Sequence, residues 1–365
     1  MSHSTSESES ESVPPLSWLP MKYPRRGGYS ADVAPVDPDA GIELAKIETD
    51  DFSLQHASWY LVNNNNPDAL TIAARKYQAG DVSALGAAAL YFLLNRFVTR
   101  DEVRVISIID GWVARHGLAF AVEALLQYSD MRFTDERVLV ADLPEGTMFG
   151  FVTHGHPASD AEFEVPKYVT RERFAQVDNS DEQVIHTPLE HMLGRMRGLI
   201  AVASDEDYAA ARSVASTLRG NTVRKLTATF IFPTELEWSE ELIMTVRPQA
   251  YHWSTQLMVS ANTPEQLRRS EDSYGPRRWL LDDAMTAAVV DGIGPAILPV
   301  LLDAFDTPNP YGNPNEESWL LRILHALSAI PTDDTFEALV CRGGITNGQP
   351  ATVRAMPNYP RPALR

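Results

Sequence analysis

The sequence predicts an all-α protein in which antiparallel helix pairs stack into an irregular α-solenoid. Helix-capping residues recur from about residue 67 to the C-terminus, each is followed by apolar residues at helical spacing, and a Gly or Pro ends each stripe. Helices with such broad apolar faces cannot bury them in isolated pairs, whereas stacked pairs can. The period is loose, roughly 40 residues per pair, so an ordinary irregular helical domain is the alternative.

Composition divides the chain into five expected regions. Residues 1–13 alternate Ser with Glu and lack apolar anchors, which predicts a disordered tail. Residues 14–60 form an irregular, proline-rich lead-in with at most short helices. Residues 61–130 form a first helical block, residues 131–184 a mixed or extended insertion, and residues 185–365 a second helical-repeat block.

In the first block, capping signals set the predicted helix starts. Asn66 before Pro67 predicts one start, and Asp81 predicts the next. Asp101 favours the positive end of a third helix, which ends at Gly117 because glycine adopts a left-handed terminal conformation at little cost. The apolar positions of these helices and of the one that follows are Leu85, Ala89, Phe92, Leu93, Phe97, Val103, Ile106, Ile109, Val113, Leu118, Ala121, Val122, Leu125 and Leu126.

The insertion lacks a helical period. Its runs RVLVADL and TMFGFV are extended or β-like, and a small strand pair is an alternative to an irregular loop. Within it, THGHPASD places His154, His156 and Asp160 where alternate residues of an extended strand share a face, which is one way to begin a metal-ligand set. His186 or His191 would have to complete the set. We interpret the run as a polar loop, with a metal-dependent hydrolase as the alternative.

The second block holds the clearest helix signals. Thr187, Pro188 and Glu190 form a capping-box pattern. Further starts are predicted at Ser204, Thr234, Thr263, Pro295 and about residue 316. Residues 223–231 are β-prone one by one, but their apolar spacing is helical, so we predict a helix. Thr332 is expected to cap the last helix, with Phe336, Leu339 and Val340 as its apolar stripe and Cys341 as a small buried residue.

Charge and cysteine content limit the function classes. The chain of 365 residues has 31 basic and 49 acidic residues, a net charge of −18, which counts against broad binding to phosphate backbones. Its single cysteine allows no internal disulfide and no cysteine metal cluster. No apolar run approaches the length of a membrane span, and the N-terminus lacks secretory features, so we expect a soluble cytoplasmic protein.

The most basic region has two interpretations. Arginines and a lysine gather in and around the predicted helices of residues 187–231, where they would form either a solvated helical face or a docking patch for an acidic partner. They are Arg195, Arg197, Arg212, Arg219, Arg224 and Lys225. No nucleotide-binding, zincin or serine-hydrolase motif is present, so no catalytic, cofactor or metal residue is assigned.

Several segments carry a resemblance to a known family. They are RHGLAFAVEALL at 115–126, SDEDYAAARSVASTLR at 204–219, FIFPTELEW at 230–238, GIGPAILPVLLDAF at 292–305 and SAIPTDDTFEALV at 328–340. Over residues 110–365 they resemble the MolR-like bacterial proteins, a family named after a proposed regulator of molybdate metabolism. The resemblance implies HEAT-like helical repeats, and it transfers no catalytic residue. No WGR domain, which some members carry, is recognisable in this chain.

Together these observations predict a non-catalytic helical-repeat scaffold. We expect it to present a groove or ridge to a protein partner, with regulation as the implied role. The first alternative is the metal-dependent hydrolase that uses the loop of His154 and His156. The second is a nucleic-acid-binding helical repeat, which the acidic balance disfavours.

Overall fold

The computed structural model describes most of the helical part of the chain. The described residues are 23–28, 33–49, 69–97, 102–139, 168–176, 187–245, 253–271, 277–307 and 316–342. They are predominantly helical, which confirms the all-α prediction. The predicted tail at residues 1–13 and the expected cap at Asn66 lie outside them.

Among the described residues, five helices precede the insertion. Their bounds are α1 Ala40–Thr49, α3 Ala69–Gln78, α4 Ala84–Phe97, α5 Glu102–His116 and α6 Leu118–Ser129. Gly117 separates α5 from α6 with a φ of 86°, a left-handed conformation that residues with a side chain rarely adopt. The predicted stop and immediate restart at this glycine are therefore confirmed.

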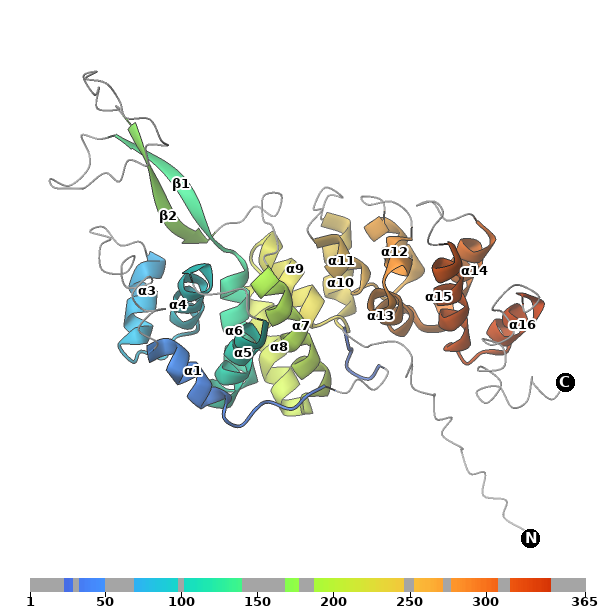
Figure 1. The fold of residues 1–365 in the computed structure, drawn as a ribbon, viewed down its shortest axis with the longest axis horizontal. Coiled ribbons are helices and arrows are strands. Elements are labelled where there is room, and N and C mark those ends of the chain that lie inside the picture. Colours follow the sequence, from blue (N-terminus) through green and yellow to red (C-terminus); the bar gives the residue numbers. More distant parts are fainter. Residues whose placement is uncertain are drawn as a thin grey trace, which may run out of the picture.

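The insertion begins and ends in a β-hairpin. β1 Met131–Leu139 pairs with β2 Tyr168–Gln176 in antiparallel register, with Met131 opposite Gln176 and Leu139 opposite Tyr168. A strand pair, which the sequence left as an alternative, is thus present and projects from the helices (Figure 1). Only residues 137–139 of the run RVLVADL lie in it, the run TMFGFV lies outside the described residues, and β2 was not predicted. At its base, the ring of Phe133 lies 5.7 Å from that of Phe92 on α4.

The remaining elements follow the insertion without another strand among the described residues. They are α7 Thr187–Val202, α8 Asp205–Leu218, α9 Thr222–Ile231, α10 Leu236–Thr245, α11 Ser254–Met258, α12 Pro264–Glu271, the 3-10 turn η3 Arg278–Leu281, α13 Asp283–Ile293, the 3-10 turn η4 Gly294–Ile297, α14 Leu298–Asp306, α15 Glu316–Ser328 and α16 Asp333–Arg342.

Side-chain caps start several of these helices where they were expected. Ser204 accepts a hydrogen bond from the backbone N–H of Asp207, Thr263 from that of Gln266, and Thr332 from that of Thr335. Each bond satisfies an N–H group that the first turn of a helix leaves without a partner. Asn221 caps α9 in the same way, so the helical prediction for this β-prone segment is also confirmed.

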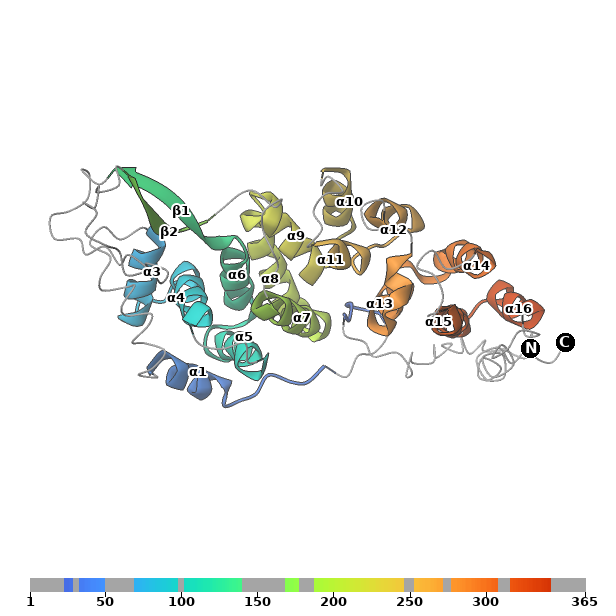
Figure 2. The ribbon, with the colours of Figure 1, turned by 45° about the horizontal axis from the view of Figure 1, so that its top comes forward.

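The helices form an elongated row from α3 to α16 (Figures 1 and 2). Along much of the row a helix packs on the second helix along the chain: α4 on α6, α6 on α8, α5 on α7, α7 on α9, α9 on α11, α11 on α13, and α13 on α15. This pattern arranges the helices in two layers, with apolar faces turned towards each other. One buried apolar cluster extends from Leu70 on α3 to Leu339 on α16.

The last described helix corrects two expectations. Phe336 and Leu339 are buried, but Val340 is 53% exposed and Cys341 is exposed. Successive residues of an α-helix are about 100° apart, so the two residues that follow Leu339 turn away from the face that packs on α15. The prediction that Val340 belongs to the apolar stripe was wrong, and so was the prediction that Cys341 is buried.

One described stretch is long and apolar enough to cross a membrane. It runs from Asp283 to Asp306, and half of its apolar window is buried inside the protein. A core helix of a soluble protein passes the same test, and Gly294, with a φ of 62°, interrupts this stretch between α13 and α14. The expectation that the chain has no membrane-spanning helix stays a prediction.

Candidate protein-interaction site

The basic residues around α7 to α9 are mostly engaged inside the protein. Arg197 is fully buried, and Arg195 and Arg224 form ion pairs with the largely buried Asp110 and Asp130. Arg212, Arg219 and Lys225 pair with glutamates of the α10 region, at N–O distances of 2.6–2.9 Å. Both sequence interpretations, a solvated face and a docking patch, are therefore wrong for Arg195, Arg197 and Arg224.

The ion pair of Asp130 and Arg224 anchors the hairpin. Asp130 lies between α6 and β1, and its Oδ2 is 2.7 Å from the Nε of Arg224 and accepts a hydrogen bond from Asn221. Gln127 of α6 accepts hydrogen bonds from Arg224 and from Gln176 of β2. Burial raises the pKa of Asp130 above 3.8, and Arg224 and Asn221 oppose that rise.

Asp130 should give a distinctive pH dependence. Because its folded pKa is raised, the stability that it contributes is fully present below pH 3.8 and is lost as the pH rises through the folded pKa. We expect the free energy of unfolding of the chain, relative to Asp130→Asn, to increase as the pH falls from about 7 towards about 4. Urea unfolding of both proteins measures this difference. A difference that increases with pH would contradict the assignment.

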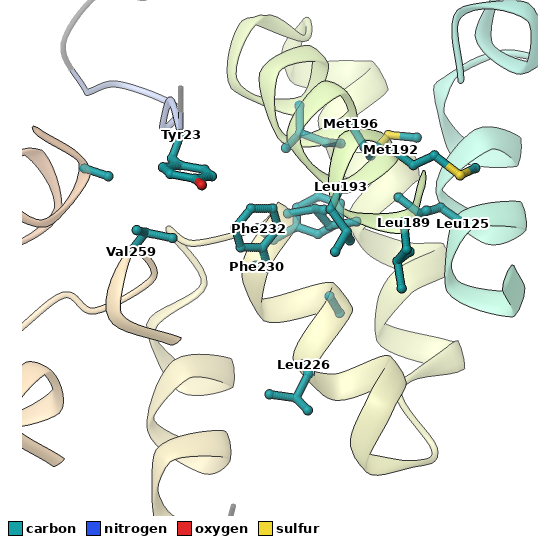
Figure 3. Close-up of a cluster of buried hydrophobic side chains, with 14 of the residues drawn as sticks. Tyr23, Leu125, Leu189, Met192, Leu193, Met196, Leu226, Phe230, Phe232 and Val259 are labelled. Atoms are coloured by element: carbon teal, nitrogen blue, oxygen red, sulfur yellow. The ribbon is translucent and has the colours of Figure 1, made fainter. Parts of the chain in front are cut away.

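The most heavily buried polar site lies where the proline-rich lead-in crosses the helix row. Residues 23–28, which we call the strap, run between α7 and α9 on one side and the segment from α11 to α13 on the other. Tyr23 and Arg25 are each only 6% exposed. The Tyr23 ring lies 5.9 Å from that of Phe230 at the end of α9, in an edge-to-face arrangement (Figure 3).

Arg197 binds the backbone of the strap and of two neighbouring segments. Its Nε donates to the carbonyl oxygen of Pro24 at 2.9 Å, Nη1 to that of Phe230 at 3.2 Å, and Nη2 to that of Val259 at 3.0 Å. The guanidinium also lies 4.9 Å from the Phe230 ring. A planar fork of donors can join three backbones in this way, whereas a lysine ammonium is a single point charge.

Arg25 enters the row from the strap itself. Its Nη1 donates to Oδ1 of Asn262 at 2.6 Å, and Nη2 donates to the carbonyl oxygens of Val259 at 2.9 Å and Ala261 at 2.7 Å. Burial lowers the pKa of Arg25 to about 10, and the charge of Asp291 opposes this. Burial and the charge of Arg25 together hold the pKa of Arg197 well below its ordinary value.

The glycines beside this site allow the close approach. A Cβ at Gly292 would collide with the guanidinium of Arg25 and would lie 2.6 Å from the carbonyl oxygen of Ala261. A Cβ at Gly28 would collide with the carboxylate of Asp291. We call Tyr23, Arg25, Arg197, Asp291 and the carbonyls that they contact the arginine junction.

The lead-in continues along the row beyond the strap. Arg195 of α7 donates to the carbonyl oxygens of Ala34 at 2.6 Å and Pro35 at 3.0 Å while it pairs with Asp110. Farther on, α1 packs against α5, where Arg115 donates to the carbonyl oxygen of Gly41. The described parts of residues 23–49 therefore cross from α13 to α5 as irregular chain, with a turn at residues 25–28, followed by a short helix.

Of the candidate metal ligands, only His191 lies in the described part of the chain. His154, His156, Asp160 and His186 lie outside the described residues, and His191 lies partly buried on α7. In the described part of the chain, no group of three His, Cys, Asp or Glu residues could hold a metal ion. Zinc analysis of the purified protein tests the hydrolase alternative directly.

Sequence reasoning missed the arginine junction. It treated Arg197 as one of a surface group and gave no role to the run Tyr-Pro-Arg-Arg-Gly-Gly at 23–28. No local signal in that run points to its buried contacts, because they lie with residues more than 170 positions away.

Comparison with known proteins identifies one family. A family model described as the YehI second domain matches residues 55–277, which is more than half of the chain and includes the hairpin. No curated protein and no solved structure matches the chain. In the arginine junction, Arg197, Phe230, Val259 and Ala261 lie inside the matched range, whereas the strap precedes it and Asp291 follows it.

Proposed function

The chain belongs to the YehI second-domain family, and we propose that it is a non-catalytic scaffold that binds a protein partner along its row of helices. In this proposal the row is a HEAT-like α-solenoid, as the resemblance to MolR-like proteins implies, and its setting is the cytoplasm. Packing of a helix on the second one along the chain, in much of the row, supports the solenoid, because stacked pairs bury their apolar faces in that manner.

The observation that carries the proposal is the course of the lead-in. Irregular segments of the chain, with a turn at residues 25–28, lie on the helix row. The buried Arg197 donates to the backbone carbonyl of Pro24, and the partly buried Arg195 donates to those of Ala34 and Pro35. Hydrogen bonds to backbone groups can hold many sequences, while side-chain sites select among them. A face that accepts one such segment by this chemistry is suited to accept another.

Charge favours a protein partner over nucleic acid. The net charge of −18 repels a phosphate backbone, and the arginines that could form a basic patch around α7 to α9 pair with carboxylates or backbone carbonyls. A protein surface does not require clustered free cations. This reasoning supports the scaffold over the nucleic-acid-binding alternative.

Affinity capture from the native host, followed by reconstitution, tests the proposal. We expect one protein to copurify with the tagged full chain in stoichiometric amount and to bind the purified chain in a titration calorimeter. Arg268→Ala, a change at an exposed residue of α12, should bind the partner equally well. Failure of every copurifying protein to bind the pure chain would contradict the scaffold.

A further inference from the structure

We propose that the arginine junction is an exchangeable peptide site. The strap, residues 23–28, occupies it within the chain, and an extended segment of a partner protein replaces the strap when it carries an aromatic residue two positions before an arginine. This inference rests on the proposed scaffold function and specifies which chemistry the partner brings.

The arginine position is the more selective one. Three acceptors converge on the guanidinium of Arg25: the carbonyl oxygens of Val259 and Ala261 and Oδ1 of Asn262. Guanidinium presents several donors in one rigid plane, and lysine cannot match that geometry. The nearby Gly292 keeps the space open, since any side chain there would occupy the position of the guanidinium.

The aromatic position is filled by Tyr23, which lies beside Arg197 and Phe230. The Tyr23 and Phe230 rings meet edge to face at a centroid distance of 5.9 Å (Figure 3). The guanidinium of Arg197 lies 5.9 Å from the Tyr23 centroid. Between the two positions, Arg197 donates to the carbonyl oxygen of Pro24. The backbone of any residue supplies such a carbonyl equally well. The site thus recognises a spacing of aromatic and arginine with a freely variable residue between them.

Charge makes the strap displaceable. Arg25 and Arg197 both donate to the carbonyl oxygen of Val259, at 2.9 and 3.0 Å, so two buried guanidinium groups lie next to each other. Asp291 is a carboxylate whose charge acts on both of them. Without the strap, the negative charge of Asp291 balances the positive charge of Arg197. The strap adds a second buried guanidinium, that of Arg25. Desolvation and mutual repulsion of the two cations oppose docking, so the strap is held less firmly than its burial alone would indicate.

The family boundary separates most of the site from its occupant. Arg197, Phe230, Val259 and Ala261 lie within the matched range, whereas Asp291 and Gly292 follow its last residue, 277, and residues 23–28 lie before its first residue, 55. The anchoring arginine and the acceptor carbonyls therefore lie inside the matched domain, and the strap lies outside it. A partner segment can fill the same role.

A peptide of the chain's own sequence tests the exchange. The probe is a fluorescent peptide with the sequence of residues 20–30, PMKYPRRGGYS, measured by fluorescence anisotropy. We expect it to bind the full chain carrying Tyr23→Ala and Arg25→Ala at least about tenfold more tightly than the unchanged chain, because the strap no longer competes. Arg268→Ala, the matched arginine control on α12, should leave peptide binding as weak as in the unchanged chain.

Two further changes identify the site. Gly292→Ala added to the double variant should abolish peptide binding, and a peptide with lysine in place of the arginine at position 25 should bind at least about tenfold more weakly. Circular dichroism checks that each chain is folded. If the double variant does not fold, Gly28→Ala, which displaces the strap against Asp291, takes its place.

Equal affinity of the peptide for the unchanged and strap-weakened chains, or no binding to either, would overturn the exchange. Peptide binding that is unchanged by Gly292→Ala would place the peptide elsewhere and would also overturn the exchange. These results are separate from the capture experiment, because a partner that binds all of these chains equally would support the scaffold while excluding the arginine junction as its contact.

Discussion

Replacing Arg197 with alanine is expected to lower the free energy of unfolding by about 3–5 kcal/mol. Arg197 is fully buried, and its removal leaves the carbonyls of Pro24 and Phe230 without this donor. A buried unsatisfied carbonyl costs about 1–3 kcal/mol, and the space left by the side chain adds a cavity. Urea unfolding followed by circular dichroism measures the change.

Gly194→Ala provides the matched control on the same helix. A Cβ at Gly194 meets no atom within 4 Å, so alanine should stabilise α7 by about 0.5–1 kcal/mol through its better helix propensity. Arg197→Lys should lie near the alanine variant, because one ammonium cannot reach three carbonyls. An Arg197→Ala protein as stable as the unchanged chain would mean that water replaces the guanidinium without loss.

Phe336→Ala is expected to cost about 3–5 kcal/mol, from lost transfer energy and a cavity. The Phe336 side chain is 6% exposed and belongs, with Leu327, Ile330 and Leu339, to the continuous apolar cluster. It lies on the helix that packs against α15 at the far end of the described row. A small effect would mean that α16 contributes little to the stability of the row.

Two neighbouring changes set the scale for Phe336. Thr332→Ala should cost roughly 1 kcal/mol, because the Thr332 hydroxyl accepts the backbone N–H of Thr335 at 3.3 Å and caps α16. Asp333→Asn should cost less, about 0.3–1 kcal/mol at an exposed first turn. Denaturant unfolding of the three variants should therefore rank Phe336, Thr332 and Asp333 in that order.

Local signals in the sequence were enough to predict most helices and their ends. Helical spacing outweighed β propensity in α9 because Val223, Leu226 and Phe230 all reach the buried face. Gly117 ends a helix and Thr332 caps one through contacts with residues close in the sequence. A few neighbouring residues were therefore enough to predict their roles. α13 was missed although Asp282 caps it, because its apolar residues occupy every side of the helix and leave no stripe.

The arginine junction could not be predicted because its contacts are distant in the chain. Arg197 bonds to a carbonyl 173 residues earlier, and Arg25 bonds to one 234 residues later. An arginine on an amphipathic helix is usually a surface residue, and only the partner segment reveals that this one is buried. The described part of residues 14–60 holds irregular segments and helix α1, and its composition carried no information on what it covers.

These long separations affect how the protein is made. During synthesis the strap leaves the ribosome before the rest of the arginine junction, and Val259, Ala261 and Asn262, which receive Arg25, emerge more than 230 residues after it. At about 5–20 residues per second, the wait is on the order of tens of seconds. Neighbouring helices of the row can pair within that time, whereas Tyr23 and Arg25 stay exposed to other proteins. Within the arginine junction, the strap is therefore translated first, and it is among the last segments to reach its native contacts.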